Sequence, residues 1–193
     1  MTNNTNNNSQ TSNSGRSELL DAGQILKDIL QLKRGEMVGD LGAGGGLFLL
    51  ESARLVGDVG QVYAVDVVKN ILSEIESKAR LANLNNIKTV WSNLEIVGAT
   101  KISEGTLDAS ILVNVLYQSK KHYEILAEAT RLLKSGGRLL VVDWSKNELS
   151  FGPPPELIIE PQKIIEIGQQ LDLNLAKEFN AGRYHFGLLF TKK

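Results

Sequence analysis

The sequence lacks cysteine entirely and contains only two histidines among its 193 residues. Without cysteine, disulfide bonds, thiolate nucleophiles and cysteine-ligated zinc are excluded. With His122 and His185 as the only imidazoles, a histidine-rich metal site is not expected either, and we predict no bound metal. The chemistry of this chain must therefore depend on carboxylates, amides, hydroxyls and backbone groups.

The chain also lacks an excess of charge of one sign and a long apolar segment. Its 21 Lys and Arg residues face 22 Asp and Glu residues, giving a net charge of −1. Nucleic acid is not an expected partner, because no overall positive field attracts it. No window is apolar enough to span a bilayer, and no apolar signal segment opens the chain. We therefore expect no membrane partner and a cytoplasmic location.

The chain divides into a tail and one domain. Residues 1–16 are nearly all Asn, Thr, Ser and Gln, which cannot bury enough apolar surface to offset the entropy of ordering, so they predict a disordered polar tail. Residues 17–193 have the length and the apolar content of a single α/β domain. A helix is expected to begin near Ser17 and to end before Gly35.

From residue 37 onward, short apolar segments alternate with amphipathic ones. This alternation predicts βαβ units and a parallel sheet of the doubly wound, Rossmann-like α/β class. The expected strands are 37–41, 61–65, 87–91, 107–113 and 138–144, and the expected helices are 47–56, 70–84 and 123–133. We also expect a short helix within 94–105 and a turn at 134–137.

From residue 151 onward the alternation of strands and helices stops. A Gly/Pro loop at 151–155 precedes a helix that starts at Pro161 and runs to about residue 171. Segments 174–179 and 184–191 then read as a hairpin, so the last strand should run antiparallel to its partner. The start of that strand lies at the carboxyl ends of the parallel strands, where ligands bind in such sheets.

A glycine-rich loop and an acid carry the clearest functional signal. The first strand leads into Asp40-Leu41-Gly42-Ala43-Gly44-Gly45-Gly46 and then into a helix. Glycines there let backbone amides approach a ligand without Cβ clashes. The second strand ends in Asp66, where an acid can accept both ribose hydroxyls of a nucleoside. The order strand, loop, helix, strand and acid predicts a nucleoside cofactor.

The spacing of the glycines favours S-adenosylmethionine over NAD. A dinucleotide fold needs a further glycine at position 47, where this chain has Leu47. Asp40, just before the loop, suits a ligand with an ammonium group and would repel a pyrophosphate. An NAD-dependent oxidoreductase is disfavoured for these reasons and by the C-terminal hairpin.

Four blocks in order resemble the class I S-adenosylmethionine-dependent methyltransferases, especially the small ones grouped with ubiquinone/menaquinone C-methyltransferase-like domains. The blocks are 38–46, 62–66, 107–117 and 132–144, and the resemblance extends from about residue 19 to the C-terminus. It implies a mostly parallel, Rossmann-like sheet with an antiparallel C-terminal strand, S-adenosylmethionine as cofactor, and methyltransferase activity.

The resemblance also implies a role for each matching position in cofactor binding. The loop would lie under the methionine moiety, the acid before it near the amino group, and the acid after the second strand on the ribose. The implied cofactor-binding residues are Asp40, Gly42, Ala43, Gly44, Gly46, Asp66, Val67, Asn93, Leu94 and Asn114.

One of these positions departs from the family pattern. Asn93 stands after the third strand where the family usually has Asp, and its amide carbonyl can still accept from the adenine N6 amine. Val67 and Leu94 would lie against the adenine ring, and Asn114 would line the pocket beside the methyl donor.

The expected substrate pocket combines the ends of several strands, and its candidates are Tyr117, Trp144, Arg183, Tyr184 and His185. His185 can be read as a general base or as a hydrogen-bonded packing residue. Tyr117 can orient a substrate or cap a helix, and Trp144 can stack on a substrate or fill the core. No catalytic residue is assigned beyond the candidates His185 and Tyr117.

The expected reaction is in-line methyl transfer, for which alignment of donor and acceptor contributes about 7–11 kcal/mol and a base is needed only if the acceptor loses a proton. We expect a small-molecule acceptor. Two alternatives stay open: a methyltransferase acting on protein or RNA, and a protein that binds S-adenosylmethionine without catalysis. The acceptor atom and the oligomeric state are not defined by the sequence.

Overall fold

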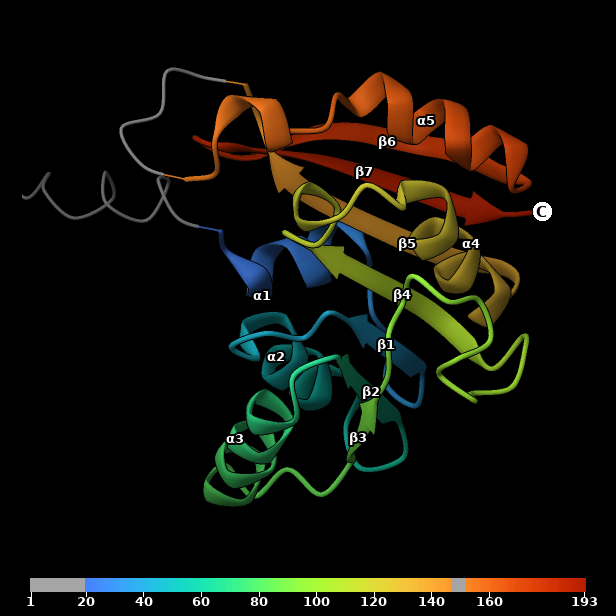
Figure 1. Cartoon of the computed structure of the whole chain (residues 1–193). Helices are drawn as coiled ribbons and strands as arrows, with labels where there is room; N and C mark the ends of the chain where they lie inside the picture. The colour runs from blue at the N-terminus through green and yellow to red at the C-terminus, as the bar shows by residue number, and fades with distance from the viewer. Residues whose placement is uncertain (1–19, 147–151) are drawn as a thin grey trace, which may run out of the picture.

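A seven-stranded sheet forms the centre of the computed structural model, which describes residues 20–146 and 152–193 (Figure 1). The tail predicted for residues 1–16 lies outside the described residues. The strand order is β3-β2-β1-β4-β5-β7-β6. The strands are β1 (Met37–Leu41), β2 (Gln61–Asp66), β3 (Ile87–Trp91), β4 (Leu107–Val113), β5 (Leu133–Trp144), β6 (Leu173–Gly182) and β7 (His185–Lys192).

Strands β1 to β5 pair with one another in parallel, whereas β7 pairs antiparallel with both β5 and β6. The fold class is therefore the one the sequence predicts: a mostly parallel, doubly wound sheet with an antiparallel C-terminal strand. The hairpin is longer than expected, because β6 extends to Gly182 through two register shifts.

Helices cover both faces of the sheet. The N-terminal helical segment, α1 (Ala22–Gln24) followed by a π-helical stretch at Ile25–Ile29, packs on one face with α2 (Leu47–Val56) and α3 (Lys69–Leu81). The other face is covered by α4 (His122–Leu132) and α5 (Pro161–Gln170) (Figure 1). Strand β4 lies between these layers and is mostly apolar apart from Asp108 and Ser110, as expected for a strand buried on both sides.

The segment between β3 and β4 differs from the prediction, because turns rather than a short helix occupy residues 94–105. Buried Glu128 of α4 accepts hydrogen bonds from the backbone N–H of Gly98 and the hydroxyl of Thr100. Arg131 donates to the carbonyl of Ile102 at 3.0 Å. These tertiary hydrogen bonds satisfy backbone groups that a helix would otherwise pair internally.

A second local prediction also changes. Strand β5 begins at Leu133, so the turn expected at residues 134–137 lies inside the strand as an irregularity. The pairing register between β4 and β5 shifts there, and Gly136 has a φ of 75°. Lys134 makes an ion pair with Asp108 across this bulge at 2.6 Å.

The fold places the ligand-binding edge between β1 and β4. Strand order runs from β1 toward β3 on one side and from β4 toward β6 on the other, so the loops that follow β1 and β4 diverge and leave a crevice. Within the described residues, no helix is long and apolar enough to cross a membrane.

Candidate functional site

The loop after β1 requires glycine for steric reasons. Gly42 has a φ of 85°, and a Cβ on it would meet the side chain of Val115 at 2.5 Å. The backbone N–H groups of Gly42 and Ala43 both donate to the carbonyl of Val65, which ties the loop to the end of β2. Gly46, with a φ of 82°, is the residue that precedes α2. The chain therefore turns sharply from strand to helix along the edge of the crevice.

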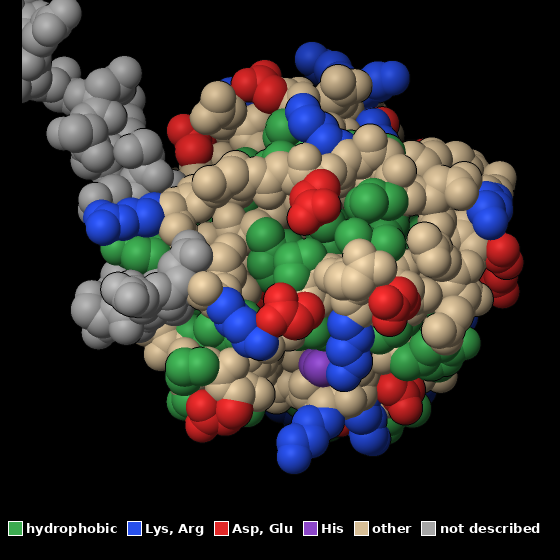
Figure 2. Space-filling view, turned by 90° about the horizontal axis from the view of Figure 1, so that it is seen from above, with side chains coloured by type: hydrophobic (Ala, Val, Ile, Leu, Met, Phe, Trp, Pro, Cys, Tyr) green, Lys and Arg blue, Asp and Glu red, His purple; other side chains and the backbone are tan. Residues whose placement is uncertain are grey.

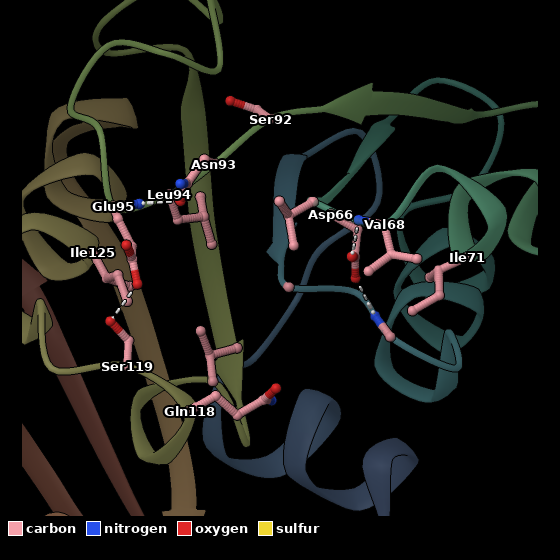
Figure 3. A pocket seen from close by; sticks show the side chains of 14 residues that line it. Asp66, Val68, Ile71, Ser92, Asn93, Leu94, Glu95, Gln118, Ser119 and Ile125 are labelled. Carbon is pink, nitrogen blue, oxygen red and sulfur yellow. Dashed lines mark hydrogen bonds between the residues drawn. The ribbon is translucent and has the colours of Figure 1, made fainter.

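Asp66 holds this loop from the neighbouring strand. Its carboxylate accepts the backbone N–H of Gly44 at 3.1 Å and that of Val68 at 2.8 Å (Figure 3). Val68 is the N-cap residue of α3 and its own side chain makes no capping hydrogen bond, so Asp66 also ties the start of α3 to the end of β2. Each carboxylate oxygen has a second acceptor site, which a ribose hydroxyl can use.

Two cavities meet at the loop. The larger, of about 320 Å³, is lined by Asp66, Val67, Asn93 and Leu94, which are the residues predicted for the ribose and adenine. The smaller, of about 280 Å³, is lined by Asp40, Ala43, Asn114 and Tyr117. Both are lined by Gly42, Gly44 and Gln118, so the two cavities adjoin. Gly46 lines neither cavity.

Asp40 is the acid of the smaller cavity, and its side chain is almost fully buried. Burial and, to a lesser extent, the charge of Asp66 raise the pKa of Asp40 to about 7, while the backbone N–H of Leu49 acts in the opposite direction. A buried carboxylate without a cationic partner is unfavourable. The cavity is therefore suited to a ligand that brings a positive charge, such as an amino group.

Two polar atoms in the walls lack partners among the described residues. The side-chain oxygen of Asn114 and the hydroxyl of Ser92 are both buried and make no hydrogen bond there. Asn114 has a φ of 55°, the left-handed region that asparagine tolerates better than most residues. Gln118 donates to the Asn114 carbonyl at 2.6 Å. Buried polar groups normally have partners, so these atoms fit a site that receives a polar ligand.

The adenine side has one unexpected contact. The side-chain oxygen of Asn93, to which the resemblance assigns the adenine amine, accepts the backbone N–H of Glu95 at 2.9 Å, so one of its two acceptor sites is engaged (Figure 3). Leu94 is buried in the wall of the larger cavity, whereas Val67, which lines the same cavity, is 60% exposed. Both are placed to contact a planar base.

Three of the five predicted substrate residues, Tyr117, Trp144 and His185, pack together beside the smaller cavity. Tyr117 lines that cavity, and its ring meets the ring of Trp144 edge-on at a centroid distance of 6.4 Å. Trp144 in turn lies 4.3 Å from the ring of His185, its partner in the β5–β7 register. The guanidinium of Arg183 lies 5.2 Å from the ring of Tyr184.

Of these five residues, only Tyr117 contributes to the wall of either cavity. Burial lowers the pKa of His185 to about 4, so its imidazole is neutral at physiological pH and weakly basic. The structure thus brings Tyr117, Trp144 and His185 together as packed rings and leaves His185 outside the cavities.

The sequence assigns no site role to Asp143, an acid at the end of a strand, but in the structure it supports the loop after β4 from β5. Its buried carboxylate accepts the backbone N–H of Leu116 at 2.9 Å and that of Tyr117 at 3.4 Å, and so holds the 3-10 turn Leu116–Gln118 at the cavities. Burial raises the pKa of Asp143 to about 6. The sequence signal that could have indicated this role is an acid that follows the apolar residues at the end of β5.

Comparison with known proteins agrees with this geometry. The sequence profile of the methyltransferase domain family matches residues 39–141. Among curated relatives, the ubiquinone/menaquinone biosynthesis C-methyltransferases of Haemophilus ducreyi and Citrobacter koseri are each 32% identical over 120 residues, or 62% of this chain. These matches cover 45% and 47% of the two relatives, so the chain spans about half their length.

Solved structures match over nearly the whole chain. An S-adenosylmethionine-dependent methyltransferase from Aquifex aeolicus superposes with a TM-score of 0.83 and 26% identity, covering 94% of both chains. A putative type 11 methyltransferase from Sulfolobus solfataricus has a TM-score of 0.73 and 23% identity over 91% of this chain and 94% of that one, which bears on the fold alone. The chain belongs to the methyltransferase domain family.

Proposed function

We propose that the two adjoining cavities hold S-adenosylmethionine and that the chain transfers its methyl group to a small organic acceptor. The observation that carries this proposal is the placement of two acids around one glycine loop. Asp66 lines the larger cavity, and Asp40, which is buried, lines the smaller one. A nucleoside that ends in an amino acid needs an acceptor for its ribose at one end and an anion for its ammonium group at the other.

The chain's own residues would act by binding and alignment. Asp66 would accept the ribose hydroxyls, Val67 and Leu94 would contact the base, and Asp40 would face the amino group. Asn114, directly after β4, would offer its side-chain oxygen to the cofactor from the wall of the smaller cavity. The bound cofactor supplies a methyl group on a positively charged sulfur, so no metal or covalent intermediate is required of the protein. The rings of Tyr117 and Trp144 would restrict where an acceptor can lie.

The lining of the smaller cavity supports an acceptor with apolar surface. Beside its polar groups it contains Leu20, Leu47, Phe48 and Val113. The curated relatives are C-methyltransferases of ubiquinone and menaquinone biosynthesis, and their identity to this chain supports a quinol-like or phenolic ring as the first acceptor class to test. Basic and acidic side chains are interspersed on the face shown in Figure 2, which gives no support to a nucleic-acid substrate.

The test measures binding and turnover on the same protein. Calorimetry with S-adenosylmethionine, S-adenosylhomocysteine and NAD should show binding of the first two in preference to NAD. Release of S-adenosylhomocysteine should then be measured against phenols, quinols, amines and thiols. Tighter binding of NAD would overturn the cofactor site. Tight binding of S-adenosylmethionine without turnover on any acceptor would favour the non-catalytic alternative.

A further inference from the structure

Glu95 is a second carboxylate in the wall of the larger cavity. It lies in the loop after β3, on the opposite side of the cavity from Asp66 (Figure 3). Asp66 accepts two backbone N–H groups and borders the glycine loop. Glu95 borders the end of the cavity formed by Leu94 and Ile125. A nucleoside between these walls would meet one carboxylate at its ribose and the other at its base.

The turn at Asn93 puts Glu95 in this place. Because the Asn93 side-chain oxygen accepts the backbone N–H of Glu95, the chain folds back immediately after β3. The same bond uses one of the two acceptor sites of the Asn93 amide oxygen. Asn93 is also exposed, whereas Glu95 is half-buried. Glu95 is thus the less hydrated acceptor of the two.

Two residues of the loop after β4 hold the Glu95 side chain. The hydroxyl of Ser119 donates to one of its carboxylate oxygens at 2.6 Å (Figure 3). The ammonium group of Lys121 lies 3.7 Å from the other oxygen. The Ser119 hydroxyl also accepts the backbone N–H of Lys121, so the three groups form one network. Each carboxylate oxygen retains an acceptor site for a ligand.

We propose that Glu95 recognises the nucleobase of the cofactor by accepting a hydrogen bond from the exocyclic amine of adenine. This inference rests on the proposed function, since it requires the nucleoside to occupy the larger cavity. A carboxylate has acceptors only, so it favours the 6-amino group of adenine and disfavours the 6-oxo group of hypoxanthine. Glu95 would then take the role that the sequence alone gives to Asn93.

The experiment compares two ligands that differ at this one position of the base. S-adenosylhomocysteine and S-inosylhomocysteine are titrated calorimetrically into the wild-type protein, Glu95→Gln and Ser119→Ala. Wild type should prefer the adenosyl ligand by about 10- to 100-fold, the range for one charge-assisted hydrogen bond. Glu95→Gln should reduce this preference by about tenfold or more, because an amide can donate to a 6-oxo group as well as accept from an amine.

Ser119→Ala is the matched control, because it breaks the network and leaves the carboxylate in place. It should weaken both ligands to a similar extent and keep the preference within about threefold of wild type, a change below 1 kcal/mol. If Glu95→Gln also weakens both ligands equally and leaves the preference unchanged, Glu95 only holds the loops together and the proposal fails.

The remaining outcomes separate this proposal from the proposed function. Binding of neither ligand by the wild-type protein would overturn the cofactor site itself and this inference with it. Equal binding of both ligands by wild type would overturn only the role of Glu95. If Glu95→Gln does not fold, Glu95→Asp replaces it: the shorter carboxylate should bind both ligands more weakly and still prefer the adenosyl one, and loss of that preference would count against the proposal.

Discussion

The pKa of Asp40 is raised to about 7, first by burial of its carboxyl and then by the negative charge of Asp66. The unfolded chain releases the same proton near its ordinary pKa of 3.8. Between these values the native state binds more protons than the unfolded state, so the contribution of Asp40 to stability falls as the pH rises from about 4 to about 7. The ligand-free site therefore contains an unfavourable buried charge at neutral pH.

Replacing Asp40 by Asn should stabilise the ligand-free protein at pH 8 by about 1–4 kcal/mol, because the amide carries no buried charge. The stabilisation should shrink toward pH 5, where the native carboxyl is protonated. Thermal unfolding at both pH values measures this difference. Affinity for S-adenosylmethionine should fall at least about tenfold with loss of the anion. A variant less stable than wild type at pH 8 would show that other contacts of Asp40 dominate.

Replacing Asp66 by Ala should reduce S-adenosylmethionine affinity by about 10- to 150-fold, the range for lost charge-assisted hydrogen bonds. It should also lower stability by about 1–3 kcal/mol, because the backbone N–H groups of Gly44 and Val68 lose their acceptor. Asp66→Asn keeps one acceptor oxygen and should lose less of both. Calorimetry and melting temperature on both variants test this. A lowered melting temperature with unchanged affinity would remove Asp66 from the binding site.

Two substitutions of Asn114 separate its backbone role from its side-chain role. The residue has a φ of 55°, which glycine adopts freely and alanine does not. Asn114→Ala should therefore lower stability by about 1 kcal/mol, whereas Asn114→Gly should stay near wild type. Both variants lack the buried amide oxygen, so both should bind S-adenosylmethionine more weakly. Affinity loss in the alanine variant alone would mean that only the backbone conformation matters.

Burial lowers the pKa of His185 from 6.5 to about 4, so between these values the native state binds fewer protons than the unfolded state. Its contribution to stability is present above pH 6.5 and is lost as the pH falls toward 4. The His185→Phe variant keeps a ring against Trp144 but has no imidazole to protonate. Between pH 7 and pH 4, its free energy of unfolding should therefore fall by about 1–2 kcal/mol less than that of wild type, after allowance for solvent screening. Unfolding free energies from pH 7 to pH 4 measure the effect.

The same variant tests the catalytic reading of His185. Because His185 lies outside the walls of both cavities, we expect kcat to fall less than about tenfold in His185→Phe. A general base would cost about 10²- to 10⁴-fold. A loss in that range, with substrate affinity retained, would place His185 at the reacting atoms despite its burial against Trp144.

Sequence patterns predicted those parts of the molecule that depend on local spacing. The glycine loop at 40–46, the acid at the end of β2 and the hairpin of β6 and β7 all follow from residues close together in the chain. Each has a steric or topological cause, such as the positive φ at Gly42 or the short connection at Gly182. Local causes can be recognised without knowing which distant segments meet.

The failures involve contacts between distant residues. The pattern predicts a helix within 94–105, but Glu128 and Arg131, some thirty residues later, bind backbone groups of Gly98 and Ile102 in that segment instead. The sequence also does not predict that Glu95 lines the larger cavity, because its position depends on Ser119 and Lys121 from another loop. Contacts between the side chains of two distant loops leave no periodicity or fixed spacing in a single sequence, so they cannot be predicted from it.

The position of β7 has a consequence for the order in which the native sheet can be assembled. Strand β6 is synthesised before β7, yet β7 is the strand with which it pairs in the described part of the sheet. Until β7 lies between β5 and β6, the edge of β5 that β7 covers has unpaired backbone groups, and β6 lacks the partner that it has in the described sheet. Phe190 of β7 packs against Gly168 of α5, so that helix also lacks part of its contact until then. The strands around the glycine loop are therefore all present in the chain before the hairpin, whereas the edge of the sheet beside Trp144 is covered only once β7 has paired with β5.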